Sequence, residues 1–263
     1  MRVGRVLLLV ALGAAFFLPS QAQQSATVAQ TTQRDAQALA LIQKSVTAFG
    51  TSVPLDSTAT GTVTVVEGST TQTGTIQILT RGATQTSETI FLPDGQRSVV
   101  YSNGNAKEAN DKGPTNPPLE LILTDQCVDF PLPLLLSVLN TSDEAYRYVG
   151  EETLDGTSTQ HIQVWNTFAS KPRLGKLSSF STRDIWFDTS SGLPLKITYS
   201  RRAGGGSAPA FPVEVTFSNY TNVNGVSYPF QINKSFNGTP WLTITIQNVA
   251  FNTGLTDAQF EVE

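Results

Sequence analysis

Hydrophobic and polar residues alternate strictly along the last third of the chain. Four successive segments carry an apolar residue at every second position, with polar residues such as Lys196, Asn233 and Thr243 between them. Side chains of a strand point alternately to its two faces, so each segment has one apolar and one polar face. The apolar sets are Leu195, Ile197 and Tyr199; Val213, Val215 and Phe217; Tyr228, Phe230 and Ile232; and Leu242, Ile244 and Ile246. This pattern predicts an antiparallel meander with one face on a core and the other in water.

The same period appears earlier in the chain. Alternation over 62–65 and 75–78 predicts a hairpin whose turn lies between Gly68 and Gly74. Residues 103–118 contain Gly, Asn and several Pro, and are expected to form a polar loop. Further strands are expected at 86–92, 97–101, 145–149 and 159–165, and in a hairpin over 184–201 whose turn is 188–192.

Helical spacing occurs in fewer places. Residues 35–49 carry apolar residues at spacings of three and four, which predicts a helix with one buried face. Asp35 can cap its N-terminus and Gly50 can end it. Residues 119–123 and 132–139 are dense in Leu, which favours helix, and both begin next to Pro. They are interpreted as two short apolar helices inserted between groups of strands.

These elements predict an α+β fold that is mainly antiparallel β. About ten twisted strands curl readily, so we expect a curved, unclosed half-barrel with a leading helix and short inserted lid helices. One long helix covers part of the apolar face, and exposing the rest costs about 25 cal/mol per Å². A lidded apolar cleft that holds a ligand follows as a hypothesis. Its expected lining is Val63, Val65, Ile76, Ile78, Leu195, Ile197, Phe217, Tyr228, Phe230, Leu242 and Ile244, with Leu134, Leu135 and Leu136 in the lid.

The first 22 residues have the pattern of a secretory signal peptide. Arg2 and Arg5 precede an apolar run of thirteen residues, 6–18, and small residues lead to Ala22. The run is shorter than the roughly 20 residues that span a bilayer. We therefore expect a signal peptide at 1–22, a flexible lead at 23–34 and one domain at 35–263. Cleavage near Ala22 would release a soluble periplasmic or extracellular protein.

Charge is spread unevenly over the chain. Without Arg2 and Arg5, 15 basic residues stand against 21 acidic ones, a net charge of −6, which argues against nucleic acid as a partner. Residues 171–202 nevertheless carry seven basic and two acidic residues, a net charge of +5. This region is either a solvated hairpin and loop, or a docking face for an acidic protein or an anionic membrane surface.

Residues able to support catalysis are few. The chain has one Cys, Cys127, and one His, His161, so it lacks the residues for a disulfide or a Cys/His zinc site. His161 lies in an alternating strand pattern with no signature of an orienting partner. The acidic pairs Asp143–Glu144 and Glu151–Glu152 flank turns, where we expect solvated charges. The sequence thus predicts no catalytic residue, no metal site and no cofactor, and a protein that is not an enzyme.

Three stretches of the last third resemble a known family. They are Phe187-Asp188-(x3)-Gly192-Leu193-Pro194-Leu195-(x)-Ile197, the segment from Tyr220 to Phe230, and Val249-Ala250-Phe251-Asn252-(x7)-Phe260. Together with the leading helix, the meander and the Leu-rich insertion, they resemble the LolA-like superfamily, which includes bacterial outer-membrane lipoprotein carriers and lipoprotein-sorting proteins. The likeness covers 35–260 by architecture and 184–260 by motif. It implies an unclosed barrel with a helical lid and an apolar cavity for acyl chains.

Two functional hypotheses result. The first is a secreted or periplasmic binding protein that holds a lipid or lipoprotein acyl chain in an apolar half-barrel cleft. The alternative is a non-enzymatic protein-interaction or envelope-sensor module that docks through the basic region 171–202.

Overall fold

Thirteen strands form one antiparallel sheet in the computed structural model, which describes residues 34–125, 128–202 and 209–262. Cys127, the expected signal peptide and nearly all of the expected flexible lead lie outside the described residues. The strands are β1 (Asp56–Glu67), β2 (Thr70–Arg81), β3 (Gln85–Leu92), β4 (Gly95–Ser102), β5 (Asn105–Asn110), β6 (Gly113–Thr115), β7 (Glu144–Leu154), β8 (Thr157–Asn166), β9 (Arg183–Asp188), β10 (Pro194–Arg202), β11 (Ala210–Val223), β12 (Val226–Phe236) and β13 (Thr239–Phe251). The helices are α1 (Ala36–Phe49), α2 (Leu119–Asp125) and α3 (Pro131–Asn140), with 3₁₀ helices η1 (Pro172–Phe180) and η2 (Asp257–Phe260).

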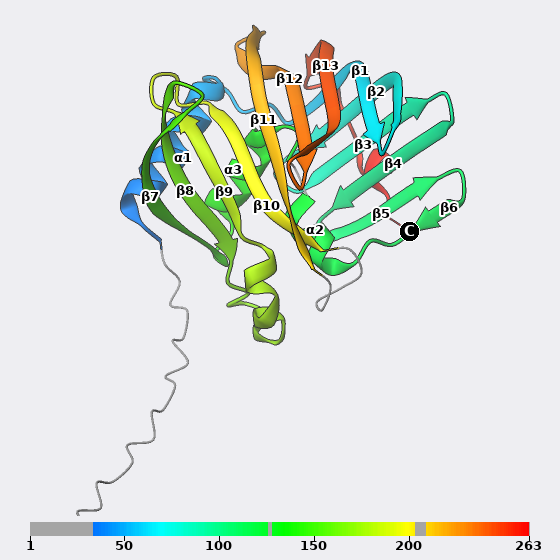
Figure 1. Ribbon diagram of the computed structural model, residues 1–263. Helices are drawn as coiled ribbons and strands as arrows, with labels where there is room; N and C mark the ends of the chain where they lie inside the picture. The colour runs from blue at the N-terminus through cyan, green and yellow to red at the C-terminus, as the bar shows by residue number, and fades with distance from the viewer. Residues whose placement is uncertain (1–33, 126–127, 203–208, 263) are drawn as a thin grey trace, which may run out of the picture. The chain divides into compact units, whose positions relative to one another are not determined.

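The order of the strands explains where the inserted helices lie. The sheet runs β6-β5-β4-β3-β2-β1-β13-β12-β11-β10-β9-β8-β7, so β6 and β7 are its two edges. The chain passes from one edge to the other through α2 and α3. Figure 1 shows the sheet bending around these helices, with α1 against the half that contains β7 to β9. The curved, unclosed half-barrel with a leading helix and inserted helices is confirmed.

The leading helix is the one expected from the sequence. Oδ1 of Asp35 accepts hydrogen bonds from the backbone N–H groups of Gln37 and Ala38, at 2.8 and 3.1 Å. After the helix, Gly50 pairs with Val226 at the start of β12. A Cβ at Gly50 would lie 2.3 Å from a backbone oxygen there, so only glycine permits this close approach. The cap and the glycine together dock the end of α1 on the sheet.

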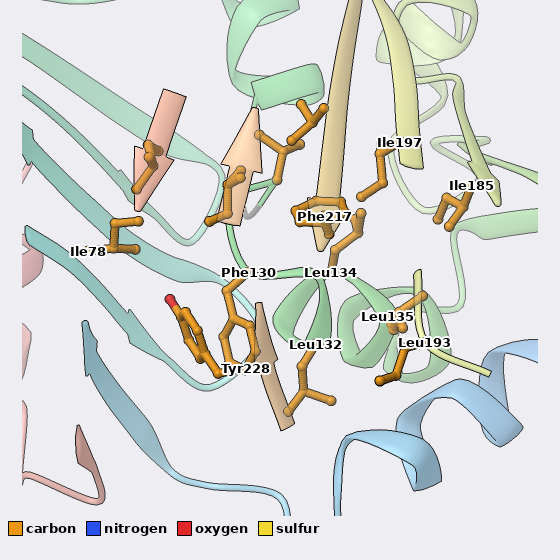
Figure 2. Close-up of a cluster of buried hydrophobic side chains, with 14 of the residues drawn as sticks. Ile78, Phe130, Leu132, Leu134, Leu135, Ile185, Leu193, Ile197, Phe217 and Tyr228 are labelled. Atoms are coloured by element: carbon orange, nitrogen blue, oxygen red, sulfur yellow. The ribbon is translucent and has the colours of Figure 1, made fainter. Parts of the chain in front are cut away.

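Aromatic rings fill the centre of the concave face. The ring of Phe130, just before α3, stacks on Tyr228 of β12 with centroids 4.4 Å apart. Phe49 of α1 meets Phe130 edge-on at 5.7 Å. Figure 2 shows this cluster continuing through α3 residues to Ile185 and Ile197 of β9 and β10. The middle of the half-barrel is therefore a packed core, and open space lies toward its ends.

Some expected boundaries are wrong. Gly74 lies inside β2 rather than in the turn. A Cβ there would come 1.9 Å from the carbonyl oxygen of Phe91 on β3, so the close approach of the two strands requires glycine. The expected loop 103–118 contains β5 and β6. Strand β5 has only Ala106 and Ala109 as apolar residues, and such a polar strand near a sheet edge gives no alternation to detect. The 3₁₀ helix η1 occupies part of the region expected to be hairpin and loop.

Candidate functional site

A groove lined by aromatic side chains lies at one end of the half-barrel. We call it the aromatic groove. Its volume is about 500 Å³, and its lining is Val66, Glu67, Arg201, Phe211, Phe236, Asn237, Thr239, Pro240 and Trp241. The rings of Phe211 and Phe236 have centroids 5.4 Å apart. Both rings and Trp241 are partly exposed, so this apolar surface has room for a ligand.

The strand register creates this groove. Val213, which is buried, pairs with Phe236, and Phe211 pairs with Arg201 on the neighbouring strand. Phe211 and Phe236 thus continue the inward-facing rows of β11 and β12 beyond the part of the face that the helices cover. The apolar rows of these two strands therefore end in partly exposed rings.

A second cavity, the inner cavity, adjoins the aromatic groove. It measures about 240 Å³ and shares Arg201 and Trp241 with the aromatic groove. Its remaining lining is Val65, Glu88, Ile90, Arg97, Ser98, Val99, Glu108, Ala109, Asn110, Thr115 and Leu242. Buried apolar residues of β1, β3 and β13 therefore line this cavity beside polar and charged residues of β3 to β6 and Arg201 of β10.

Charged groups meet beside the inner cavity, which Glu88 and Arg201 line. Nζ of Lys234 lies 2.5 Å from Oδ1 of Asp129 and 3.4 Å from Oε2 of Glu88. The guanidinium of Arg201 lies 3.6 Å from a carboxylate oxygen of Asp125. We call these five residues the ion cluster. Asp125 and Asp129 belong to the segment that carries α2 and α3, whereas the other three belong to the sheet, so the cluster attaches the inserted helices to the concave face.

Burial determines the protonation of the ion cluster. Burial raises the pKa of Glu88 to about 8, against the opposing attraction of Lys234. Burial alone lowers the pKa of Lys234, but Asp129 and Glu88 outweigh it and raise that pKa above its ordinary value. At neutral pH Lys234 is therefore charged and Glu88 is mostly protonated.

A third cavity, the end cavity, lies against α2 and α3. It measures about 480 Å³ and is lined by residues of mixed polarity: Ala83, Thr84, Asn103, Gly104, Leu119, Leu123, Leu134, Ser137, Thr141, Asp143, Glu144, Asn166, Phe168, Ser170, Lys171, Leu174, Ser181 and Arg183. The expectation that Asp143 and Glu144 are solvated is wrong, because both are buried here. Asp143 accepts hydrogen bonds from the backbone and hydroxyl of Ser170, and burial raises the pKa of Glu144.

The residues expected to line a cleft fall into three groups. Val65 and Leu242 line the inner cavity, and Leu134 lines the end cavity. Leu136 and Phe230 are partly buried against the core, and Leu195 is partly buried beside a register shift in β10. The remaining eight are at most 2% exposed and line none of these three cavities: Val63, Ile76, Ile78, Leu135, Ile197, Phe217, Tyr228 and Ile244.

The sequence contained a signal for the ion cluster that we did not use. Lys234 follows Tyr228, Phe230 and Ile232 at a spacing of two, which places its ammonium group on the apolar face. Glu88 is likewise two residues from Ile90, which places its carboxyl group on the apolar face of that strand. A charge in phase with an apolar face requires a buried partner, because an unpaired buried charge is strongly destabilising. The sequence signal for the aromatic groove is weaker, because Phe211 and Phe236 only extend the alternating apolar rows of β11 and β12.

The outer face of the sheet holds a different charged group. Nδ1 of His161 lies 2.7 Å from Glu152 and Nε2 lies 2.8 Å from Asp184. The imidazole also stacks on Trp186, which Lys196 covers from the other side at 4.3 Å. His161 thus has two oriented partners that its sequence context did not reveal. Among the described residues, no group of three or more His, Cys, Asp or Glu side chains could hold a metal ion.

Comparisons by sequence and by structure give different results. No protein-family model and no curated protein matches the sequence. By structure, the chain is similar to a DUF1329 family protein from Desulfovibrio piger, at 14% identity and TM-score 0.58, over 88% of this chain and 98% of the other. It is also similar to a LolA superfamily protein from Nitrosomonas europaea, at 13% identity and TM-score 0.56, over 85% and 97% of the two chains.

A candidate outer membrane lipoprotein-sorting protein domain from Vibrio parahaemolyticus gives a similar match. It has 14% identity and TM-score 0.55, over 85% of this chain and 96% of the other. At such identities the likeness concerns the fold, and it confirms the LolA-like architecture that the sequence motifs indicated. None of the helices in the described parts of the chain is both long and apolar enough to cross a bilayer.

Proposed function

We propose that this protein binds the acyl chain of a lipid or lipoprotein in the aromatic groove and the inner cavity. The observation that carries the proposal is that the two spaces adjoin each other, with Arg201 and Trp241 lining both. Three partly exposed rings line the outer part. The inner part is lined by the buried residues Val65, Ile90 and Leu242 together with polar and charged residues of β3 to β6. Ligand sites are typically concave, mostly apolar and 300–1,000 Å³ in volume. At about 500 and 240 Å³, the two spaces together lie in this range.

The energetics favour a ligand with a long apolar chain. Burying about 14 methylene groups yields roughly 11 kcal/mol, at ~0.8 kcal/mol each. Association costs an estimated 4–15 kcal/mol, so useful affinity requires the chain to be enclosed along most of its length. The inner cavity supports this enclosure, because it adjoins the groove and adds the apolar contacts of Val65, Ile90 and Leu242.

The inserted helices act as the lid in this proposal. Leu134, Leu135 and Leu136 of α3 cover the concave face, and the ion cluster attaches the inserted segment to the sheet. In the arrangement described, a chain that reaches from the groove into the inner cavity contacts Val65 and Leu242. Eight of the residues expected to line the cleft are buried in the core. They would contact a ligand only after α3 and Phe130 move away from the concave face.

The test is the uptake of a fluorescent fatty acid by the mature protein and by the double variant Phe211→Ser/Phe236→Ser. Each ring contributes about 1.5 kcal/mol or more when it is covered by a ligand, so the double variant should bind roughly a hundredfold more weakly. Phe91→Ser is the matched control, because this ring is 47% exposed on the outer side of β3. It should leave uptake unchanged.

Native mass spectrometry of the purified protein provides a second measurement. We expect co-purified lipid on the unmodified protein and less of it on the double variant. Equal uptake by the double variant and by the control, with both variants folded in urea titrations, would show that the groove is not the acyl site. A protein that carries no lipid and takes up no fatty acid would contradict the proposed function itself.

The proposed location is the periplasm or the cell exterior. It rests on the signal-peptide pattern of residues 1–22. Expression of the full chain in a bacterial host should yield a mature N-terminus close to Gln23 in the periplasmic or extracellular fraction. An intact N-terminus on cytoplasmic protein would contradict this location.

A further inference from the structure

The 3₁₀ helix η1, taken together with its N-cap residue Lys171, carries exposed positive charge. Figure 1 shows this segment, in yellow-green, extending beyond the ends of β8 and β9. Lys171, Arg173 and Lys176 are all exposed, and none of them forms an ion pair with any residue that the structure describes. Three cations within six residues therefore face the surroundings at one end of the molecule.

The remaining basic residues of 171–202 interact with other groups of the same chain. Arg183 is buried and donates to the carbonyl oxygen of Leu123 in α2. Arg201 pairs with Asp125, and Arg202 lies over the ring of Phe180 at 5.1 Å. Lys196 pairs with Glu214 and covers Trp186. The broad basic region of the sequence thus reduces to one compact cationic surface, η1.

Apolar residues and a cavity adjoin this cationic surface. Lys171 and Leu174 of this segment line the end cavity, together with Leu119 of α2, which is 37% exposed. The two carboxylates of the same cavity, Asp143 and Glu144, are buried. The surface around the opening therefore combines exposed cations with partly exposed leucines, which is the combination that binds proteins to anionic bilayers.

The size of η1 argues against a protein as its partner. A specific protein–protein interface uses about 20–30 residues on each side and buries roughly 800 Å² per partner. At ~2.0 Å per residue, the nine residues of η1 extend about 18 Å. A bilayer has no such minimum area, because each cation contributes separately to attraction by anionic headgroups.

We propose that η1 is the contact through which this protein docks on an anionic lipid surface, with the end cavity opening toward the bilayer. The docking is independent of any ligand in the aromatic groove. It also gives the molecule a preferred orientation, because the net charge outside residues 1–22 and 171–202 is −11 and is repelled by the same surface.

The test compares two triple variants of the mature protein in vesicle co-sedimentation. Lys171→Gln/Arg173→Gln/Lys176→Gln removes the cations of η1. Lys107→Gln/Lys112→Gln/Arg147→Gln is the matched control, since it removes two Lys and one Arg that lie outside η1 and form no ion pair with a described residue. The vesicles contain phosphatidylglycerol and phosphatidylcholine in equal parts, or phosphatidylcholine alone.

We expect the unmodified protein and the control to bind the anionic vesicles and to lose this binding at high salt. Each cation near such a surface contributes about fivefold, so the η1 variant should bind roughly a hundredfold more weakly. Equal binding by the two triple variants, or equal binding to both kinds of vesicle, would overturn the proposal. Binding of η1 to polyglutamate but not to anionic vesicles would overturn it in favour of an acidic protein partner. Thermal unfolding checks that both variants are folded.

Discussion

Each face of the sheet places one basic side chain between two acidic side chains, but the surroundings differ. On the concave face, Lys234 lies between Glu88 and Asp129, and the side chains of all three are 8–12% exposed. On the outer face, the imidazole of His161 lies between Glu152 and Asp184. The concave group lies under the inserted helices, whereas the outer group lies on the polar side of β7 to β9.

The difference shows how burial decides which member of such a group titrates. In the interior, burial raises the pKa of Glu88 to about 8, and the cation stays charged. On the outer face, the hydrogen bond from Trp186 helps to lower the pKa of Glu152, and the carboxylate stays charged. There the cation is the group that titrates in the physiological range. Similar geometry thus gives an attachment point on one face and a proton-dependent contact on the other.

Removing the interior cation should have the largest effect on stability. Lys234→Met leaves Asp129 and Glu88 buried without their partner, and breaking a buried ion pair in this way typically costs 3–5 kcal/mol. We expect a loss of about this size in the free energy of unfolding from urea titrations. Lys196→Met on the outer face, which breaks the pair with Glu214, should cost about 1 kcal/mol or less.

Neutralising the carboxylates identifies the source of this loss. Lys234→Met combined with Glu88→Gln and Asp129→Asn should recover most of the stability, because no buried charge is then unpaired. Equal losses for Lys234→Met and Lys196→Met would show that the two faces do not differ as we conclude.

The pH dependence of stability should distinguish Glu88 from its neighbours. The pKa of this carboxyl is raised from 4.5 to about 8 in the folded protein, so the folded state binds more protons than the unfolded state between these values. Its contribution to stability is therefore present below pH 4.5 and is lost as the pH rises through 8. Glu88→Gln mimics the protonated acid and should remove this loss.

The measurement compares urea unfolding of Glu88→Gln and of the unmodified protein at several pH values. The two should be nearly equal near pH 4.5. Above pH 8 the variant should be more stable by on the order of 5 kcal/mol, which corresponds to the rise of this pKa from 4.5 to about 8. A variant that is less stable at pH 9 would show that Glu88 is ionised and needed by Lys234.

The sequence predicted the frame of the molecule well, for a physical reason. Alternation over four strands and the helical spacing of 35–49 are local patterns, and each element needs its apolar residues in phase to reach the core. Asp35 and Gly50 marked the helix ends through equally local chemistry. The polar strand β5 was missed because, near a sheet edge, it needs little apolar surface.

The site depends on contacts that no local pattern contains. Lys234 meets Glu88 across 146 residues of the chain, and only the curvature of the sheet brings them together. The basic region 171–202 is another example. Its net charge was visible, but which cations form internal pairs depends on α2, which contributes Asp125 and the carbonyl oxygen of Leu123.

The outer group offers the smallest effect and the most direct readout. Nδ1 and Nε2 of His161 both face carboxylate oxygens, and only the imidazolium can donate to both. Burial alone would lower its pKa, but the hydrogen bonds to Asp184 and Glu152 outweigh it and raise the pKa above 6.5. The chain has one histidine, so a single imidazole resonance reports this pKa in an NMR titration.

Glu152→Gln and Asp184→Asn should each lower the pKa of His161, since each removes one negative charge that stabilises the imidazolium. The contribution to stability is fully present below pH 6.5 and is lost as the pH rises through the folded pKa, with a size of about 1 kcal/mol or less. Trp186, which stacks on the ring, should change its fluorescence over the same pH range. A pKa at or below 6.5 in the unmodified protein would mean that the imidazole is mostly neutral at pH 7. The two faces would then no longer share the arrangement of a charged basic side chain between two acidic side chains.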